Sequence, residues 1–212
     1  MKRMMIVGFV ILLCGIMMIP TYAQEAEEVL GELQDSLGWN DETTQKVGKA
    51  MASFQENMAE TMAKYEDAEE PDPQAMIGDI KKARGAYQKD LESILGKDGL
   101  KAYNEYVEKV MLDMFSDIAE IRLLDLKPHI DLTDEQIEKL RTPMGQAYLD
   151  LFRTLFKYGD QKMNTRTKIK LGKSVKKIQS SIETAQKEVL SEEQLAALEK
   201  YKEEQKQAKE SN

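Results

Sequence analysis

The chain has 212 residues, and its 30 basic residues against 38 acidic ones give a formal net charge of −8 at pH 7. A negative net charge favours solubility and disfavours general binding to nucleic acids and other polyanions. Charged residues make up 32% of the chain and aromatic residues only 7%, which suits helices with a large polar surface better than a thick globular core.

Residues 1 to 23 have the pattern of a secretory signal peptide. Two basic residues precede an apolar run from Met4 to Ile19, and after Pro20 the small residues Thr21 and Ala23 stand at the third and first positions before a cleavage site. The run of about 16 apolar residues is shorter than the roughly 20 that a membrane-spanning helix needs. We therefore expect cleavage after Ala23 and a periplasmic or secreted protein, and an uncleaved membrane anchor is the alternative.

The lone cysteine, Cys14, lies inside this leader, and the bulky Leu13 stands before it where a lipoprotein signal would carry a small residue. Cleavage would leave about 189 residues without a thiol, a disulfide or a cysteine metal ligand. That length is enough for one domain or for two small ones.

Apolar residues recur at steps of three and four along the rest of the chain, and no segment shows a sustained period of two, so the sequence predicts an all-α fold. In chain order we expect a short helix over 24 to 38 and then apolar helical stripes from Val47 to Tyr65, Met76 to Ile94, Leu100 to Ile121, Ile137 to Tyr158 and Leu171 to Val189. The acidic segment EDAEEPDP, residues 66 to 73, contains two prolines and predicts a loop between antiparallel helices. Because Pro128 disfavours the helical conformation of Lys127, the third stripe is expected to end near KPH, residues 127 to 129.

The second half of the chain repeats the order of the first. Residues 39 to 51 align with residues 132 to 144 at an offset of 93, and blocks beyond the hairpin loop align at an offset of 95. We interpret this as an internal duplication of two tandem helical-hairpin units, the first over 24–127 and the second over 128–212. Chance similarity between two amphipathic hairpins is the alternative.

Two short segments, Thr133 to Gln136 and Ser191 to Gln194, fit the capping-box pattern S/T-x-x-E/Q. In this motif the hydroxyl of the cap residue accepts a hydrogen bond from the backbone three residues on, and the Gln side chain bonds back to the cap amide. A leucine directly before each cap can pack against the first turn. We therefore expect a helix-capping role for Leu132, Thr133, Gln136, Leu190, Ser191 and Gln194.

The sequence offers few groups for catalysis or metal binding. His129 is the only histidine, and no nucleophile in a recognisable motif lies near it. The segment GKDG, residues 96 to 99, lacks the spacing of a phosphate loop and is expected to be a turn. The acidic loop lacks the Gly and the terminal Glu of a calcium site. We expect no enzyme activity, no cofactor and no metal.

One stretch runs against the overall charge. Between Lys157 and Lys177 there are eight basic residues and one acidic residue, Asp160. Four of the basic residues share one helical face, namely Arg166, Lys170, Lys173 and Lys177. An acidic client, an anionic membrane surface or a partner helix would suit this basic stripe. An ordinary solvated face is the alternative, because the stripe lies away from the apolar row of the same helix.

The eight methionines that follow the leader, among them Met51, Met58, Met62, Met111 and Met114, allow two interpretations. Flexible, polarisable Met side chains suit promiscuous apolar binding, and they also fill helical cores. The sequence does not distinguish these roles, because it does not show which face of each helix is covered.

The two capping motifs, in a helical chain behind a signal peptide, resemble those of the LTxxQ proteins of the bacterial envelope, the Spy/CpxP family. The segment DLTDEQIEKLRTPM matches the first motif at Leu132, Thr133 and Gln136. The segment VLSEEQLAALEKYKEE matches the second at Leu190 and Gln194, with Ser191 in place of Thr. The resemblance covers residues 130 to about 205 and reaches the first half only through the inferred duplication.

This resemblance implies a periplasmic, ATP-independent chaperone or an envelope-stress accessory protein, from a family whose members form thin curved dimers and hold unfolding clients on a basic concave face. Some relatives bind zinc, for which this chain lacks the ligands. The chain departs from the family in carrying two copies of the unit, and residues 39, 40 and 43 have lost the Leu, Thr and Gln of the motif.

We therefore expect a helical binding protein that captures unfolded envelope proteins through the basic stripe and then through Met and aromatic side chains. The alternative is a structural or regulatory adaptor that binds one folded envelope partner. We expect no nucleic-acid partner and no membrane span after cleavage. The oligomeric state, and whether the two halves form one cradle or separate lobes, stay open.

Overall fold

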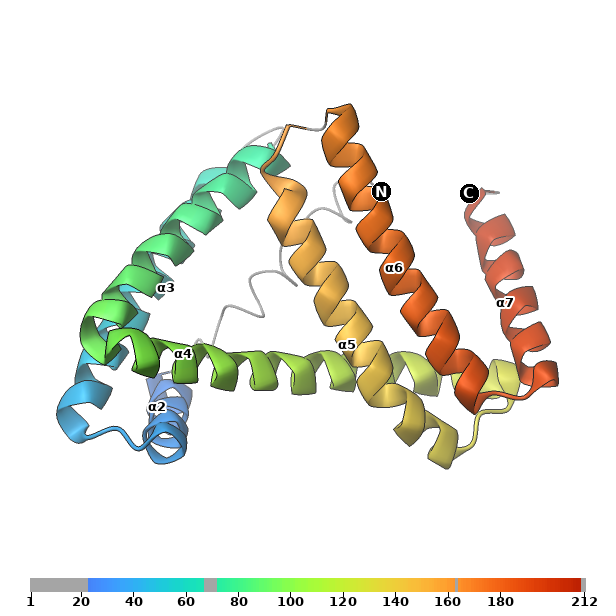
Figure 1. Cartoon of the computed structure of the whole chain (residues 1–212), viewed down its shortest axis with the longest axis horizontal. Helices are drawn as coiled ribbons and strands as arrows, with labels where there is room; N and C mark the ends of the chain where they lie inside the picture. The colour runs from blue at the N-terminus through green and yellow to red at the C-terminus, as the bar shows by residue number, and fades with distance from the viewer. Residues whose placement is uncertain (1–22, 67–71, 163, 211–212) are drawn as a thin grey trace. The chain divides into compact units, whose positions relative to one another are not determined.

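The computed structural model describes residues 23–66, 72–162 and 164–210 (Figure 1). These residues form α-helices and no strand, so the predicted all-α fold is confirmed. In chain order the helices are α2 (Ala23–Leu37), α3 (Asp41–Glu66), α4 (Pro73–Ile130), α5 (Asp134–Gly159), α6 (Thr165–Val189) and α7 (Glu192–Glu210). The apolar run of the leader and most of the predicted acidic loop lie outside the described residues.

The long helix α4 is interrupted at Gly96, whose φ of 67° and ψ of 178° are not helical. Glycine adopts a positive φ readily because it has no Cβ. The interruption separates the two apolar stripes that the sequence predicts on either side of GKDG, and only the first residue of that segment leaves the helix.

The third stripe ends near KPH, as predicted, although α4 continues through Pro128 to Ile130. A proline this close to the end of a helix disturbs few further turns, so the cost that excludes it from a helix interior is reduced. The helix ends where Asp131 adopts a left-handed φ of 51° and the Leu132 N–H donates to the Lys127 carbonyl at 3.3 Å. This backbone arrangement is a Schellman motif.

The chain divides into two compact units by spatial packing. Among the described residues, unit 1 comprises those up to Val107 together with Gly159–Lys162, and unit 2 comprises Glu108–Tyr158 together with those after Lys162. The division falls inside α4. The predicted units, 24–127 and 128–212, have other limits than these, and the duplication stays a prediction.

In unit 1, α3 packs antiparallel to the first part of α4. Near one end of the pair, the Tyr65 hydroxyl donates to the Asp79 carboxylate at 2.8 Å, and further along Phe54 stacks on Tyr87 with ring centroids 4.7 Å apart. Between these two contacts the residue numbers fall along α3 and rise along α4, so the two helices run antiparallel. The buried members of this core are Leu33, Val47, Met51, Tyr87, Leu91 and Tyr103.

In unit 2, the C-terminal part of α4 crosses α5 at very short range. A Cβ added to Gly145 would lie 2.7 Å from the backbone nitrogen of Ser116, so only glycine fits at this crossing. The Phe115 and Phe152 rings lie beside it, with centroids 5.7 Å apart. The larger core cluster of the unit contains Ala119, Leu123, Ile130, Leu132, Ile137, Leu140, Met144, Leu190 and Leu198.

The turns that lead into α3 and α5 are built alike. Gly38 has a φ of 64°, as Asp131 has a positive φ in the other turn. The Trp39 N–H donates to the Gln34 carbonyl at 3.0 Å, which corresponds to the bond from Leu132 to Lys127. Asn40 then caps α3, accepting from the Thr43 N–H at 2.8 Å. The two turns are offset by 93 residues, the offset that the sequence alignment predicts.

Side-chain contacts near these turns also correspond at that offset. Gln34 donates to Asp41 at 2.9 Å, and Lys127 donates to Asp134 at 2.6 Å. One turn into each helix an ion pair follows, Lys46 with Glu42 in α3 and Lys139 with Glu135 in α5. Both helices therefore begin with the same set of local interactions.

Candidate functional site

Both predicted capping boxes form reciprocal hydrogen bonds. At the start of α5, the Gln136 N–H donates to the Thr133 hydroxyl at 3.2 Å, and the Thr133 N–H donates to Gln136 Oε1 at 3.1 Å. At the start of α7, the Gln194 N–H donates to the Ser191 hydroxyl at 3.2 Å, and the Ser191 N–H donates to Gln194 Oε1 at 3.0 Å. Each motif thus satisfies two backbone N–H groups that a helix leaves unpaired.

The two leucines before the caps are buried. Leu132 and Leu190 are 3% and 7% exposed and belong to the same core cluster as Ile137. Leu195 packs against that cluster from α7. The two leucines therefore anchor the starts of α5 and α7 to one core. This is the position of the hydrophobic staple, in which a residue before the cap packs against the first turn of the helix.

The carboxylate of Glu193 belongs to the second cap. The Ser191 hydroxyl donates to it at 2.9 Å. A backbone N–H at its own position and then this hydroxyl hold the pKa of Glu193 below its ordinary value. A negative charge is also favoured in the first turn of a helix, where the unpaired N–H groups point.

The motif glutamines bond to each other, a contact that the sequence analysis missed. Gln136 Nε2 donates to Gln194 Oε1 at 2.8 Å, and Gln194 Nε2 donates to Gln136 Oε1 at 3.0 Å. Their second N–H groups donate to backbone carbonyls, Gln136 to Val189 at 3.1 Å and Gln194 to Asp131 at 2.9 Å. The turn before α5 and the turn before α7 are thereby joined.

A signal for this pair was present in the sequence. A capping glutamine uses its oxygen to accept from the cap residue and keeps two N–H donors for other acceptors. Two such glutamines, in motifs at the start of two helices of one hairpin unit, can satisfy these donors by facing each other. The pairing explains why both motifs carry Gln rather than Glu, because Glu has no N–H to donate.

Unit 1 lacks this pair at the positions that the predicted repeat aligns. Thr43 stands where Gln136 stands in unit 2, and Gly99 stands at the position of Gln194. The same junction in unit 1 contains an aromatic contact, in which Trp39 stacks on Tyr103 with centroids 6.2 Å apart. Neither aligned position of unit 1 therefore carries a glutamine, and the contact described nearby is between two aromatic rings.

Tyr103 also takes part in a buried hydroxyl pair. Its oxygen lies 2.9 Å from that of Tyr87, and both rings are almost fully buried. Burial raises the pKa of both phenols above the ordinary value, so they stay protonated across the physiological range. The pair satisfies two polar groups within the core, as buried hydroxyls require.

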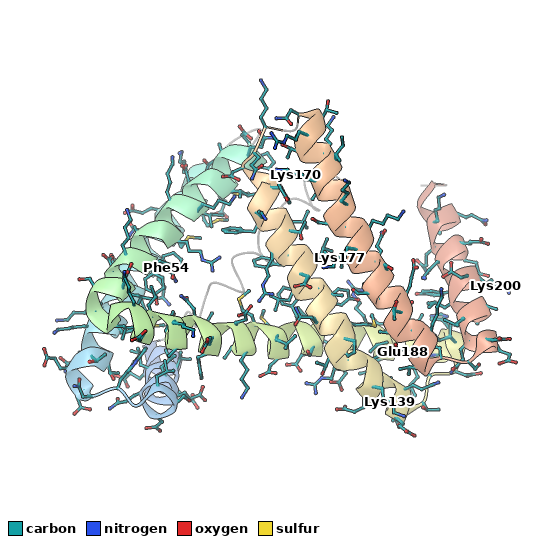
Figure 2. The ribbon with its side chains drawn as sticks, in the orientation of Figure 1. Phe54, Lys139, Lys170, Lys177, Glu188 and Lys200 are labelled. Atoms are coloured by element: carbon teal, nitrogen blue, oxygen red, sulfur yellow. The ribbon has the colours of Figure 1, made fainter. Side chains whose placement is uncertain are left out.

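The basic stripe lies on the exposed side of α6. Arg166, Lys170, Lys173 and Lys177 are all exposed, and Figure 2 labels Lys170 and Lys177 along the helix. The opposite side carries Ile178, which is 8% exposed. The ion pairs of the described residues include none of the four stripe residues.

The one acidic residue within the basic stretch is already engaged. Asp160 forms an ion pair with Lys81 inside unit 1. It therefore leaves the charge of the stripe uncompensated. An exposed isoleucine, Ile169, lies beside Arg166 and Lys170 on α6 with 54% of its surface accessible, so the stripe combines positive charge with an apolar contact.

The structure assigns most of the methionines to the core. Met51, Met58, Met76 and Met144 are between 3% and 8% exposed. Three others, Met62, Met111 and Met114, are half-buried, and nothing is described for the side chain of Met163. At least four methionines therefore fill the helical core. In unit 2, Met111 and Met114 are partly accessible for contact with another molecule.

His129 stacks against Tyr201 of α7, with ring centroids 4.4 Å apart. Within the described ranges, no three His, Cys, Asp or Glu side chains gather as a metal ion would need. The contact of His129 therefore links the end of α4 to α7 inside unit 2.

Among the helices of the described residues, none is both long enough and apolar enough to cross a membrane. Over the described residues the fold is all-α in two compact units, and α6 carries an exposed basic face. Comparisons of this chain with protein-family models, with curated proteins and with solved structures found no match.

Proposed function

We propose that this chain is a periplasmic or secreted helical binding protein that acts as an ATP-independent chaperone of the Spy/CpxP type. The observation that carries the proposal is the basic stripe of α6, whose four cations are exposed and make no ion pair with a carboxylate of the described residues. The LTxxQ motifs add to it, since they stand at the starts of two helices in one unit and bond to each other. Two tandem units in one chain would supply two related surfaces.

The mechanism begins with charge attraction. Uncompensated cations on an exposed helix raise the local concentration of acidic client segments and speed the encounter. Ile169, which is exposed on the same helix, then provides weak apolar contact. Because no nucleotide is consumed, release depends on the weakness of each contact, and the client refolds after it dissociates.

An aggregation assay tests this proposal. The purified protein at an equimolar ratio should slow the aggregation of a chemically denatured acidic client, and higher salt should reduce the effect. Reversing the stripe with Arg166→Glu, Lys170→Glu, Lys173→Glu and Lys177→Glu should abolish most of the protection. A protein that leaves the aggregation rate unchanged would rule out the chaperone function.

A matched control separates the stripe from net charge. Four exposed lysines outside the stripe, changed to Glu, give the same change in net charge: Lys49, Lys89, Lys97 and Lys206. The control variant should keep the protection. Equal loss in both variants would attribute the effect to total charge and not to the face of α6.

The second candidate is an adaptor that binds one folded envelope partner. A specific observation favours it, namely an exposed apolar row on α4 at Val110, Ile121 and Leu124. Crosslinking in cells followed by purification distinguishes the two functions, because an adaptor yields one stoichiometric partner and a chaperone yields many at low occupancy. The export step is tested separately by mass spectrometry, which should find an N-terminus at Gln24.

A further inference from the structure

The C-terminal part of α4 carries a row of exposed apolar side chains. Val110, Ile121 and Leu124 have 46%, 59% and 49% of their surface accessible, and the half-buried Met114 lies between them. At 3.6 residues per turn their spacing places all four on one side of the helix. The opposite side is the buried one, where Phe115 and other residues pack against α5 within unit 2.

The same side of α4 is bordered by carboxylates. Asp113 and Glu120 lie along one border of the apolar row and Asp125 along the other, whereas Asp117 lies within the row, between Met114 and Ile121. Arg141 of α5 pairs with both Asp117 and Glu120, so one positive charge faces two negative ones. Asp113 has no ion pair, and the pair of Asp125 with Arg122 is long at 4.0 Å.

We propose that this face of α4 binds an amphipathic helix of a partner protein whose polar borders carry Lys or Arg. The row from Val110 to Leu124 extends over about 20 Å at 1.5 Å per residue, which matches three to four turns of a second helix. An extended peptide fits less well, because it gains most of its affinity from an exposed sheet edge and α4 uses its own backbone groups internally. The charge at the borders then selects a basic helix over an acidic one.

This binding face differs from the basic stripe of α6 in both sign and partner. The proposal therefore does not depend on chaperone activity, and either can fail alone. The apolar row has four residues, fewer than the roughly 20–30 per partner of a standard interface, so the complex is expected to be weak. A weak and salt-sensitive contact suits a partner that binds and leaves.

Synthetic peptides provide the probe. Three fluorescently labelled helical peptides share one leucine face and differ at its borders, where they carry Lys, Glu or Gln. The protein used is the full chain carrying Arg166→Gln, Lys170→Gln, Lys173→Gln and Lys177→Gln, which removes the basic stripe of α6 as a second site for the Glu peptide. Fluorescence anisotropy should show the Lys peptide binding at least tenfold more tightly than the Glu peptide. Raising the salt concentration should reduce that difference, because exposed charges are screened.

Two variants of exposed residues locate the binding site. Ile121→Ser combined with Leu124→Ser removes apolar contact and should weaken binding of the Lys peptide at least tenfold. Asp113→Lys combined with Asp125→Lys should invert the preference, so that the Glu peptide binds more tightly. Ile169→Ser is the matched control, because this residue is equally exposed but lies on α6. Circular dichroism of each variant verifies that the helices are intact.

Three results would overturn the proposal. The first is equal binding of the Lys and Glu peptides, and the second is unchanged binding after Ile121→Ser with Leu124→Ser. The third comes from sedimentation of the protein alone: if it forms a dimer that this double variant dissociates, the occupant of the α4 face is a second copy of the chain. A monomer that binds the Lys peptide through α4 supports the proposal.

Discussion

The side-chain amides of Gln136 and Gln194 each donate a hydrogen bond to the other, at 2.8 Å and 3.0 Å, although 58 residues separate them in the chain. Each glutamine also caps its own helix. The pair therefore couples the stability of two helix starts, so that loss of one glutamine leaves donors of the other unsatisfied.

A double-mutant cycle measures this coupling. Gln136→Ala and Gln194→Ala should each lower the free energy of unfolding of unit 2 by about 1–3 kcal/mol, because each leaves half-buried polar groups without partners. The double variant should cost less than the sum by roughly 1 kcal/mol. Urea unfolding followed by far-UV circular dichroism gives these values.

Two controls accompany the cycle. Gln179→Ala removes an exposed glutamine of α6 and should have little effect. The single tryptophan, Trp39, lies in unit 1, so its fluorescence reports on the unit that the substitutions do not touch. Strict additivity of the two costs would contradict an energetic link between the motifs.

The close crossing of α4 and α5 predicts opposite effects for two Gly→Ala substitutions. Gly145→Ala forces a Cβ against the Ser116 backbone and should destabilise unit 2 by about 1–3 kcal/mol. Gly172→Ala, in the exposed part of α6, meets no atom within 4 Å and should stabilise by about 0.5–1 kcal/mol. Thermal unfolding of both variants checks the prediction, and a stable Gly145→Ala protein would show that the helices do not approach so closely.

The left-handed turn residues predict a second pair of opposite effects. Asp131→Gly relieves a positive φ of 51° and should stabilise by up to about 1 kcal/mol, whereas Gly38→Ala introduces that strain and should cost about 1–2 kcal/mol. Glu183→Gly in α6 is the control and should destabilise by about 1 kcal/mol, since glycine is unfavourable inside a helix. Chemical denaturation compares the three. A destabilised Asp131→Gly variant would argue against the left-handed conformation.

A carboxylate in unit 1 predicts a dependence on pH. Asp79 accepts hydrogen bonds from Lys64 at 2.7 Å, Tyr65 at 2.8 Å and Lys82 at 3.1 Å, and these donors hold the pKa of Asp79 well below its ordinary value of 3.8. A depressed pKa stabilises the folded state above the unfolded pKa, and this contribution is lost as the pH falls through the folded value.

Unfolding of the wild type and of Asp79→Asn as a function of pH tests this assignment. At neutral pH the variant should be less stable, and the difference should shrink as the pH falls below about 3.8, the ordinary value for Asp. Asp90→Asn, at an exposed position of α4, is the control. A difference that stays constant down to strongly acidic pH would show that the charge of Asp79 does not stabilise the unit.

The helical elements were accessible from the sequence because their physical causes are local. The three-to-four spacing of apolar residues, the S/T-x-x-Q caps and the glycine at position 96 each act within a few residues of the chain. Helix α4 runs through Pro128 to Ile130, one residue beyond KPH, because the preference of the residue before a proline is weaker than the packing of Ile130 in the core.

The candidate site was accessible only in part. The position of the basic stripe on one face of α6 followed from spacing, but its lack of carboxylate partners depends on where every acidic side chain lies in space. The amide pair of Gln136 and Gln194 and the exposed row on α4 were both missed. The amide pair depends on which residues far apart in the chain become neighbours. The exposed row depends on which helix faces have no neighbour in the folded chain.

The sequence by itself determined the helices, their caps and the alignment of the two halves, since these depend on interactions over a few residues. Only the tertiary structure decided which faces are covered. It buries Met51 and Met144 in the cores, joins two caps through a pair of amides, and leaves the α6 cations and the α4 apolar row exposed. Burial is a property of the packed arrangement, because an amphipathic stripe specifies that a face can be covered but not what covers it.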